Sequence, residues 1–186
     1  MIDEVKKLIS NYSASHPTPD REPANSAVLV PLHQRDEELW ITFIKRSQDM
    51  GLHRGQMGLP GGMEEPDDQG NLLHTALRES FEEIGINARD VDITGRLKAQ
   101  STIKSGLGVQ PFVGIIPWPY RFTIDHREVQ SVHSANLKVM AAGVLGAENS
   151  FDLMPPVYPV DDEPVWGLTA RIVRELVEVL KPLWNE

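Results

Sequence analysis

The chain of 186 residues contains no cysteine. This absence excludes a disulfide framework, a thiolate zinc site and a thiol nucleophile, and it makes a cytoplasmic location the expectation. Long apolar runs are also missing, since the longest are only a few residues, as in 27–30. A transmembrane helix needs about 20 apolar residues, so the sequence predicts none. Asp3 and Glu4 stand where a secretory signal would be basic, so no signal peptide is expected.

Positive charge is scarce relative to negative charge. The chain holds 18 lysines and arginines against 27 aspartates and glutamates, which gives a formal net charge of −9. Binding to nucleic-acid phosphates needs a basic face, so a general nucleic-acid binder is disfavoured, although a local basic groove stays open. Hydrophobic residues make up 40% of the chain, which is an ordinary globular composition. We therefore expect a globular protein without nucleic-acid or membrane partners, and the sequence leaves a homodimer open.

Hydrophobic spacing, glycines and prolines divide the chain into elements. Residues 1–25 are expected to hold a short amphipathic helix over 3–14 and an extended linker over 15–25, where three prolines fall. Residues 26–186 are expected to form a single domain. Its predicted strands are 26–32, 39–45, 91–99, 109–117 and 128–132, with a polar turn at 33–38, and its predicted helices are 71–84 and 165–183. This order favours an α/β (α+β) sandwich with a mixed sheet over a doubly wound fold.

The predicted helix over 71–84 carries three acids on one face. Glu79, Glu82 and Glu83 are spaced i, i+3 and i+4, and helical residues with this spacing are neighbours. The opposite face is expected to be apolar and consists of Leu73, Leu77, Phe81 and Ile84. Like charges repel, and Arg78 balances only part of them by pairing with Glu82 at i+4. A solvated helix face would explain these acids, but carboxylates on a rigid helix also suit Mg²⁺ or Mn²⁺ held together with substrate phosphates.

Glycines on both sides of this helix complete a pattern. Gly61 and Gly62 precede the helix, within a glycine-rich loop over 47–62, and Gly85 follows it. Glycine lets the backbone approach a ligand closely and ends a helix in the left-handed conformation. The run of Gly61-Gly62 followed by residues 76–86 resembles the Nudix box, in which a glycine and a spacer precede Arg-Glu-x-x-Glu-Glu-x-Gly. This resemblance to the Nudix family implies an α/β/α sandwich with the acidic helix against the mixed sheet.

The resemblance also implies an activity and roles for single residues. Nudix proteins usually hydrolyse a nucleoside diphosphate derivative at its pyrophosphate with Mg²⁺ or Mn²⁺. The metal ligands would be Glu79, Glu82, Glu83 and the backbone carbonyl of Gly61. Arg78 would hold a carboxylate in place through an ion pair. Such metals neutralise the polyanionic pyrophosphate and lower the pKa of bound water, so the chemistry fits an acidic helix.

Two positions of the resemblance stay open. The spacer between Gly62 and Arg78 is longer than is usual in the family, so the acid that the family carries there is not assigned. The candidates for it are Glu65, Asp67 and Asp68. The general base is either a helix glutamate or a later one, for which Glu128 is the candidate. An exposed glutamate at a strand edge would explain Glu128 as well.

The segment before the helix resembles the coenzyme A pyrophosphatase branch of the family. Arg46, Ser47, Gly55 and the run 59–62 match the signature of that branch, with leucine in place of phenylalanine at position 59. Gly51 stands where the branch usually has a basic residue. The substrate-binding candidates are Arg46, Ser47, His53, Arg54 and Gly55, and His53 or Arg54 would compensate for the base missing at position 51. Segments 109–117 and 165–170 also resemble this branch.

The substrate expected from this resemblance is coenzyme A or acyl-CoA. Cleavage would yield 4'-phosphopantetheine, or its acyl form, and adenosine 3',5'-bisphosphate. One alternative is a pyrophosphatase that acts on ADP-ribose, NADH or a similar dinucleotide. An alternative of another class is a nucleotide-sensing module that no longer cleaves. The complete set of Glu79, Glu82 and Glu83 argues against a non-catalytic module, because such a module needs no full set of metal ligands.

Overall fold

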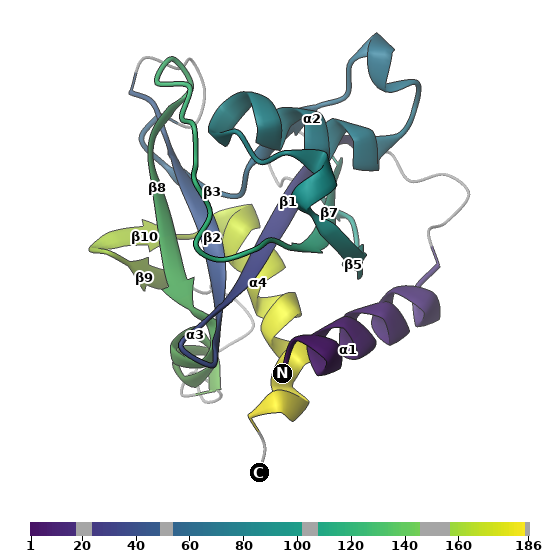
Figure 1. Ribbon diagram of the computed structural model, residues 1–186, viewed down its shortest axis with the longest axis vertical. Helices are drawn as coiled ribbons and strands as arrows, with labels where there is room; N and C mark the ends of the chain where they lie inside the picture. Colours follow the sequence, from purple (N-terminus) through teal and green to yellow (C-terminus); the bar gives the residue numbers. More distant parts are fainter. Residues whose placement is uncertain (18–23, 49–53, 102–107, 146–156, 185–186) are drawn as a thin grey trace.

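The computed structural model describes residues 1–17, 24–48, 54–101, 108–145 and 157–184 (Figure 1). The helices are α1 (Ile2–Ser15), α2 (Leu72–Ile84), α3 (Leu137–Leu145) and α4 (Gly167–Leu180), with short 3₁₀ turns at Pro66–Asp68, Ala88–Asp90 and Lys181–Leu183. The strands are β1 (Ala24–Arg35), β2 (Glu38–Arg46), β3 (Met57–Gly58), β4 (Gly61–Met63), β5 (Asp92–Arg96), β6 (Gln100–Ser101), β7 (Gly108–Ile115), β8 (Val129–Asn136), β9 (Tyr158–Val160) and β10 (Glu163–Val165). In this part of the chain no helix is both long and apolar enough to cross a bilayer.

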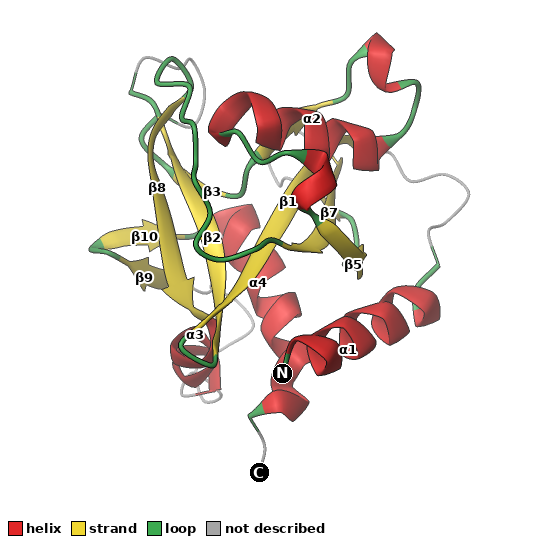
Figure 2. Ribbon diagram, in the orientation of Figure 1, coloured by secondary structure: helices red, strands yellow, loops and turns green. Residues whose placement is uncertain are grey.

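Strand β1 lies at the centre of the main sheet. It runs parallel to β7 and antiparallel to β2 and β4. The order β3-β2-β1-β7-β5 is extended by β8 beside β2 and by β6 beside β7, whereas β9 and β10 form a separate hairpin. Figure 2 shows these strands with helices on either side. The combination of parallel and antiparallel pairs confirms the predicted mixed sheet.

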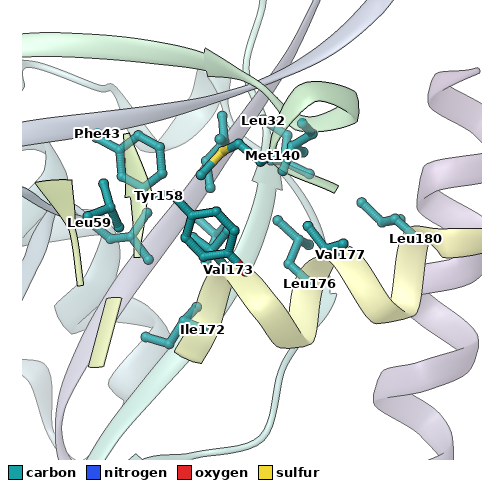
Figure 3. Packing of buried hydrophobic residues seen from close by; sticks show 14 of the residues in the cluster. Leu32, Phe43, Leu59, Met140, Tyr158, Ile172, Val173, Leu176, Val177 and Leu180 are labelled. Carbon is teal, nitrogen blue, oxygen red and sulfur yellow. The ribbon is translucent and has the colours of Figure 1, made fainter. Parts of the chain in front are cut away.

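The two faces of the sheet carry two hydrophobic cores. Side chains alternate between the faces of a strand, and in β1 Val30 and Leu32 belong to one core while Leu29 belongs to the other. The larger core joins the sheet to α1, α3 and α4, and Figure 3 shows apolar side chains of α4, among them Val173 and Leu176, pointing towards the sheet. Leu29 packs with Ile84 at the end of α2. The sheet is therefore sandwiched between α2 and the other helices.

The hairpin between β1 and β2 is tighter than the sequence predicted. The strands extend to Arg35 and start again at Glu38, so the turn consists of Asp36 and Glu37, both with positive φ. His33 was predicted to belong to the polar turn, but it lies in strand β1. This side chain is fully buried in β1, because its ring stacks on Trp118 with the ring centroids 4.2 Å apart.

The later part of the chain contains elements that the sequence analysis missed. Strand β8 continues to Asn136, beyond the predicted 128–132, and leads directly into α3. His133 of β8 lies 2.7 Å from Ser131 Oγ and 2.9 Å from Asp161 Oδ2, so it fastens the β9–β10 hairpin to β8. The C-terminal helix begins at Gly167, because Val165 belongs to β10.

Helix α1 packs against the rest of the domain. Val5 and Ile9 are fully buried in the larger core. The hydroxyl of Tyr12 donates a hydrogen bond of 2.6 Å to Glu175 of α4, and Lys6 forms an ion pair with Asp92 at the start of β5. The predicted amphipathic helix over 3–14 is thus present over Ile2–Ser15, whereas residues 18–23 of the predicted linker lie outside the described residues.

Candidate functional site

Helix α2 has defined ends that fix its position. The side chain of Asn71 accepts hydrogen bonds from the backbone N–H groups of Leu73 and His74, which caps the N-terminus. Gly85 ends the helix in the left-handed conformation at φ 73°, and the N–H groups of Gly85 and Ile86 donate to carbonyls of the last turn. Helix α2, which packs against β1 and β4, is therefore capped at both ends, and its end at Gly85 is the predicted one.

The buried face of α2 differs from the predicted one. Phe81, expected on the apolar face, is 56% exposed, whereas Glu83 is only 1% exposed. The fully buried positions are Thr75, Ala76, Ser80, Glu83 and Ile84. Their side chains are mostly small, so the helix backbone approaches the sheet closely and turns Glu83 inward. A solvated helix face therefore explains Glu82, whose side chain is 52% exposed, but not Glu83.

The glycine pair before the helix makes two close approaches possible. At Gly61, with φ 150°, a Cβ would lie 2.3 Å from the carbonyl oxygen of Ala27 and 2.6 Å from the Cα of Val28 in β1. At Gly62, a Cβ would lie 2.4 Å from the carboxyl carbon of Glu79. Gly61 therefore lets β4 pair with β1, and Gly62 leaves the space that the Glu79 carboxylate fills.

Arg78 is bonded to three carboxylates at once. Its guanidinium donates to both oxygens of Asp68, at 3.1 and 2.9 Å, and to Glu79 and Glu82 at 3.0 Å each. Of the three acids that the sequence left open, Asp68 is buried, whereas Glu65 and Asp67 are exposed. Asp68 also accepts hydrogen bonds from Thr75 Oγ1 and the backbone N–H of Glu65. Thr75 and Arg78 lie i, i+3 on the helix, so a single carboxylate can contact both.

We expect Asp68→Asn to lower the free energy of unfolding by about 3 kcal/mol at neutral pH, because it breaks a buried ion pair. Hydrogen bonds from Arg78 hold the pKa of Asp68 well below its usual range. The pair therefore stabilises the fold above the ordinary pKa of an aspartate, and this contribution is lost as the pH falls through the acidic range. Denaturant unfolding at several pH values measures the difference, with the exposed Asp67→Asn as control. A destabilisation that stays constant down to pH 3 would contradict this assignment.

Glu83 and Arg46 form a second, deeper ion pair. The Oε2 atom of Glu83 accepts a hydrogen bond of 2.9 Å from the backbone N–H of Gly61, and its Oε1 lies 3.5 Å from Arg46 Nη2. The same Nη2 donates to the carbonyl oxygen of Gly61 at 3.2 Å. Burial raises the pKa of Glu83 to about 8, although Arg46 and the Gly61 N–H oppose this rise. The carboxylate thus lies where negative charge is costly without a nearby cation.

Glu128, which precedes β8, lies near Glu79 and Glu83. The backbone N–H of Ser47 donates to the carbonyl of Glu128 at 2.8 Å, so Glu128 lies beside the end of β2. Burial is the largest cause of the raised pKa values of Glu79 and Glu83, and the charge of Glu128 raises both further. The structure therefore brings Glu128 near the helix acids, within range of electrostatic interaction.

The predicted substrate loop is placed only in part. Its base is closed by the backbone N–H of Arg46, which donates to the carbonyl of Gln56 at 3.0 Å. Gly55 adopts φ 62°, a left-handed conformation that favours glycine. Arg54 is exposed. His53 lies outside the described residues, as does Gly51.

The chemistry of these side chains fits a hard divalent cation. The carboxylates of Glu79, Glu82, Glu83 and Glu128, with the Gly61 carbonyl, supply oxygen donors of the kind that Mg²⁺ and Mn²⁺ prefer. Within the described ranges, no three acidic or imidazole side chains converge on one point as they stand. Instead, Arg78 forms ion pairs with Glu79 and Glu82, and Arg46 forms one with Glu83. Each of the three helix acids thus already faces a positively charged group, which is consistent with a cation-binding site.

Comparisons with known proteins agree with this geometry. The NUDIX domain family matches residues 23–123. The chain is 31% identical over 191 residues to the Nudix hydrolase NudL of Yersinia pestis, covering 94% of each chain, and it matches NudL of Yersinia pseudotuberculosis serotype IB to the same extent.

Two solved structures show the same fold. The NUDIX domain of Shewanella oneidensis NrtR, solved in complex with ADP ribose, has a TM-score of 0.52 at 16% identity and covers 95% of this chain and 98% of its own. The MutT protein of Methanosarcina mazei has a TM-score of 0.53 at 18% identity, with coverages of 91% and 100%. These results confirm the predicted α/β/α sandwich. Together with the family match and the NudL relatives, they show that the chain belongs to the Nudix family, as a hydrolase of nucleoside diphosphate derivatives.

Proposed function

We propose that the chain hydrolyses the pyrophosphate of coenzyme A or acyl-CoA, yielding 4'-phosphopantetheine or its acyl form and adenosine 3',5'-bisphosphate. The observation that carries this proposal is the position of the segment that resembles the coenzyme A pyrophosphatase branch. Arg46, the first residue of that segment, contacts Gly61, one of its last, and also Glu83 of the helix. The substrate signature and the acidic helix thus meet at one place in the fold.

The proposed division of labour follows from charge and burial. Glu79, Glu82, Glu83 and the Gly61 carbonyl would hold Mg²⁺ or Mn²⁺. When bound, such a cation neutralises the diphosphate and acidifies water. Arg78, held by Asp68, positions Glu79 and Glu82 by donating a hydrogen bond to each.

The roles of the substrate loop and of the base complete the proposal. Arg46, Ser47, His53, Arg54 and Gly55 would bind the substrate. An arginine fork suits a phosphate, because it donates two parallel hydrogen bonds. Glu128 is our candidate for the general base, since it lies outside the helix and outside the guanidinium contacts of Arg78. The helix glutamates remain the alternative for this role.

A single panel of substrates tests the proposal. Purified protein with Mg²⁺ or Mn²⁺ would be assayed on CoA, ADP-ribose, NADH and diadenosine polyphosphates, with release of 4'-phosphopantetheine as the readout for CoA. Glu83→Gln serves as the control for contaminating activity. We expect the highest kcat/KM on CoA or an acyl-CoA. Turnover of ADP-ribose or NADH without turnover of CoA would replace our proposal with a dinucleotide pyrophosphatase.

Gly51 is the sequence feature that favours the dinucleotide alternative, since it stands in place of a basic residue of the CoA branch. We expect Gly51→Arg to lower KM for CoA about tenfold, because a charge-assisted contact to phosphate contributes about 1.5–3 kcal/mol. A phosphate contact remote from the scissile bond holds ground and transition states alike, so kcat should change little. Kinetics on CoA and on 3'-dephospho-CoA locate the contact. A lower KM for CoA alone places it at the 3'-phosphate, and a lower KM for both places it at the pyrophosphate. An unchanged KM on both would contradict the CoA assignment.

A further inference from the structure

The guanidinium of Arg46 lies between two oxygens that serve as metal ligands in the proposed function. Its Nη2 atom is 3.2 Å from the Gly61 carbonyl oxygen and 3.5 Å from Glu83 Oε1. A divalent cation bound by these oxygens would have to displace the guanidinium, because Mg²⁺ binds oxygen at only about 2.0–2.1 Å and its charge repels a guanidinium beside it. The guanidinium and a metal ion therefore compete for one place.

A buried carboxylate needs such a counter-charge. Glu83 is 1% exposed, and an unpaired charge at this depth is strongly unfavourable. Arg78, the arginine of helix α2 itself, is bonded to Asp68, Glu79 and Glu82 instead. Arg46 therefore supplies the positive charge that Glu83 requires while no metal is bound.

The backbone of Arg46 is held in place, whereas its side chain reaches the surface. The backbone is fixed on both sides, since the N–H of Arg46 donates to Gln56 and the N–H of Ser47 donates to Glu128. The side chain itself is flexible and 22% exposed. Once displaced from Glu83, its fork would stay close to Ser47 and, across the hydrogen bond from the Arg46 N–H to Gln56, to Gly55, two residues to which the proposed function assigns the substrate. A free guanidinium there can donate two parallel hydrogen bonds to oxygens of a diphosphate.

We infer that Arg46 is an internal counter-cation that a divalent metal displaces from Glu83 and that then binds the diphosphate of the substrate. Metal and nucleotide consequently bind cooperatively through one side chain. The inference deepens the proposed function and depends on it for the identity of the metal ligands. Coupling of this kind is reciprocal, so the metal strengthens nucleotide binding by the same factor by which the nucleotide strengthens metal binding.

The first test measures Mn²⁺ binding by calorimetric titration without nucleotide. Arg46→Met removes the competing cation, and we expect its Kd for Mn²⁺ to fall about tenfold, within the usual range of coupling between sites. The matched control is Arg35→Met, at the far end of β1, which should bind Mn²⁺ like the wild type. Equal or weaker Mn²⁺ binding by Arg46→Met would overturn the inference. If Arg46→Met does not fold, as judged by circular dichroism, Arg46→Gln takes its place.

A double-mutant cycle separates this inference from the proposed function. In a Glu83→Gln background the gain from Arg46→Met should vanish, because the carboxylate for which both cations compete is gone. A gain that persists would show that Arg46 acts elsewhere and would overturn the inference. If Glu83→Gln binds Mn²⁺ as well as the wild type, the metal assignment of the proposed function fails. If Glu83→Gln weakens Mn²⁺ binding but Arg46→Met does not strengthen it, only the present inference fails.

The second test measures coupling to a diphosphate. The probe is α,β-methylene-ADP, titrated with and without saturating Mn²⁺ into the wild type and Arg46→Met. Direct chelation of Mn²⁺ by the probe is the same for both proteins, so the difference between them isolates Arg46. We expect Mn²⁺ to strengthen probe binding several-fold more in the wild type than in Arg46→Met. An equal strengthening in both would overturn the coupling.

Discussion

Glu83→Gln is expected to lower kcat at least about a hundredfold while the fold survives. Loss of one group that stabilises developing charge typically costs that much in an enclosed site. The amide oxygen of glutamine can still accept the N–H of Gly61, and burying a neutral amide costs less than burying a carboxylate. Burial raises the pKa of Glu83, so the fold disfavours its charged form, in contrast to Asp68. Without metal, the variant should therefore unfold at the same temperature as the wild type or higher. Steady-state kinetics on the substrate found in the panel, with thermal unfolding by circular dichroism, checks both parts.

Glu82→Gln should show a similar loss of kcat for a different structural reason. Its side chain is 52% exposed and bonded to Arg78, so its removal leaves the core unchanged. Glu178→Gln, on the exposed side of α4, is the matched control and should keep full activity. Near wild-type turnover by Glu82→Gln or Glu83→Gln would show the metal assignment to be wrong. An unchanged rate for Glu128→Gln would remove only Glu128, as candidate base, from the site.

Gly61→Ala is expected to destabilise the protein by about 3 kcal/mol or more. The new Cβ would lie 2.3 Å from the Ala27 carbonyl oxygen, and both this atom and the Cα of Val28 belong to the central strand. Backbone in the middle of a sheet cannot yield cheaply, so overpacking and the strain of a positive φ add together. Denaturant unfolding measures the loss. Two other glycines provide matched controls.

Gly58→Ala is the neutral control, because nothing lies within 4 Å of a Cβ at that position. Gly62→Ala separates folding from function. Its Cβ would meet the carboxylate of Glu79, the far end of a flexible side chain that can move away. This variant should fold like the wild type and lose activity, because Glu79 is displaced. If Gly61→Ala were as stable as Gly58→Ala, the close approach of β4 to β1 would not depend on glycine.

The sequence predicted the parts of the site that depend on local spacing. The i, i+3, i+4 acids, the glycine after the helix and the glycine pair before it all lie within one stretch of chain, and their pattern resembles a known family. Residues close in sequence have few ways to be arranged once a helix forms, so such a pattern is informative. The pairing of Arg78 with Glu82 followed from the same spacing and is present.

Features that depend on distant contacts were missed or left open. The choice among Glu65, Asp67 and Asp68 depended on which of these side chains is buried against α2, and this is Asp68. Strand β8 was predicted too short, because its length depends on pairing with β2, which the sequence of β8 alone does not reveal. Helix α3, which follows it, was not predicted. Polar residues such as His33 and Glu83 were expected at the surface, and tertiary packing buries both.

The sequence by itself determined the family, the mixed α/β architecture and the set of acids, because these depend on residue type and spacing along the chain. The tertiary structure alone decided the orientation of α2, and with it which acid is buried and which cation each acid contacts. A helix is turned by what packs beneath it, and here the small side chains of Ala76 and Ser80 let α2 settle closely on β1 and β4. That close packing carries Glu83 into the interior, where Arg46, 37 residues earlier in the chain, meets it.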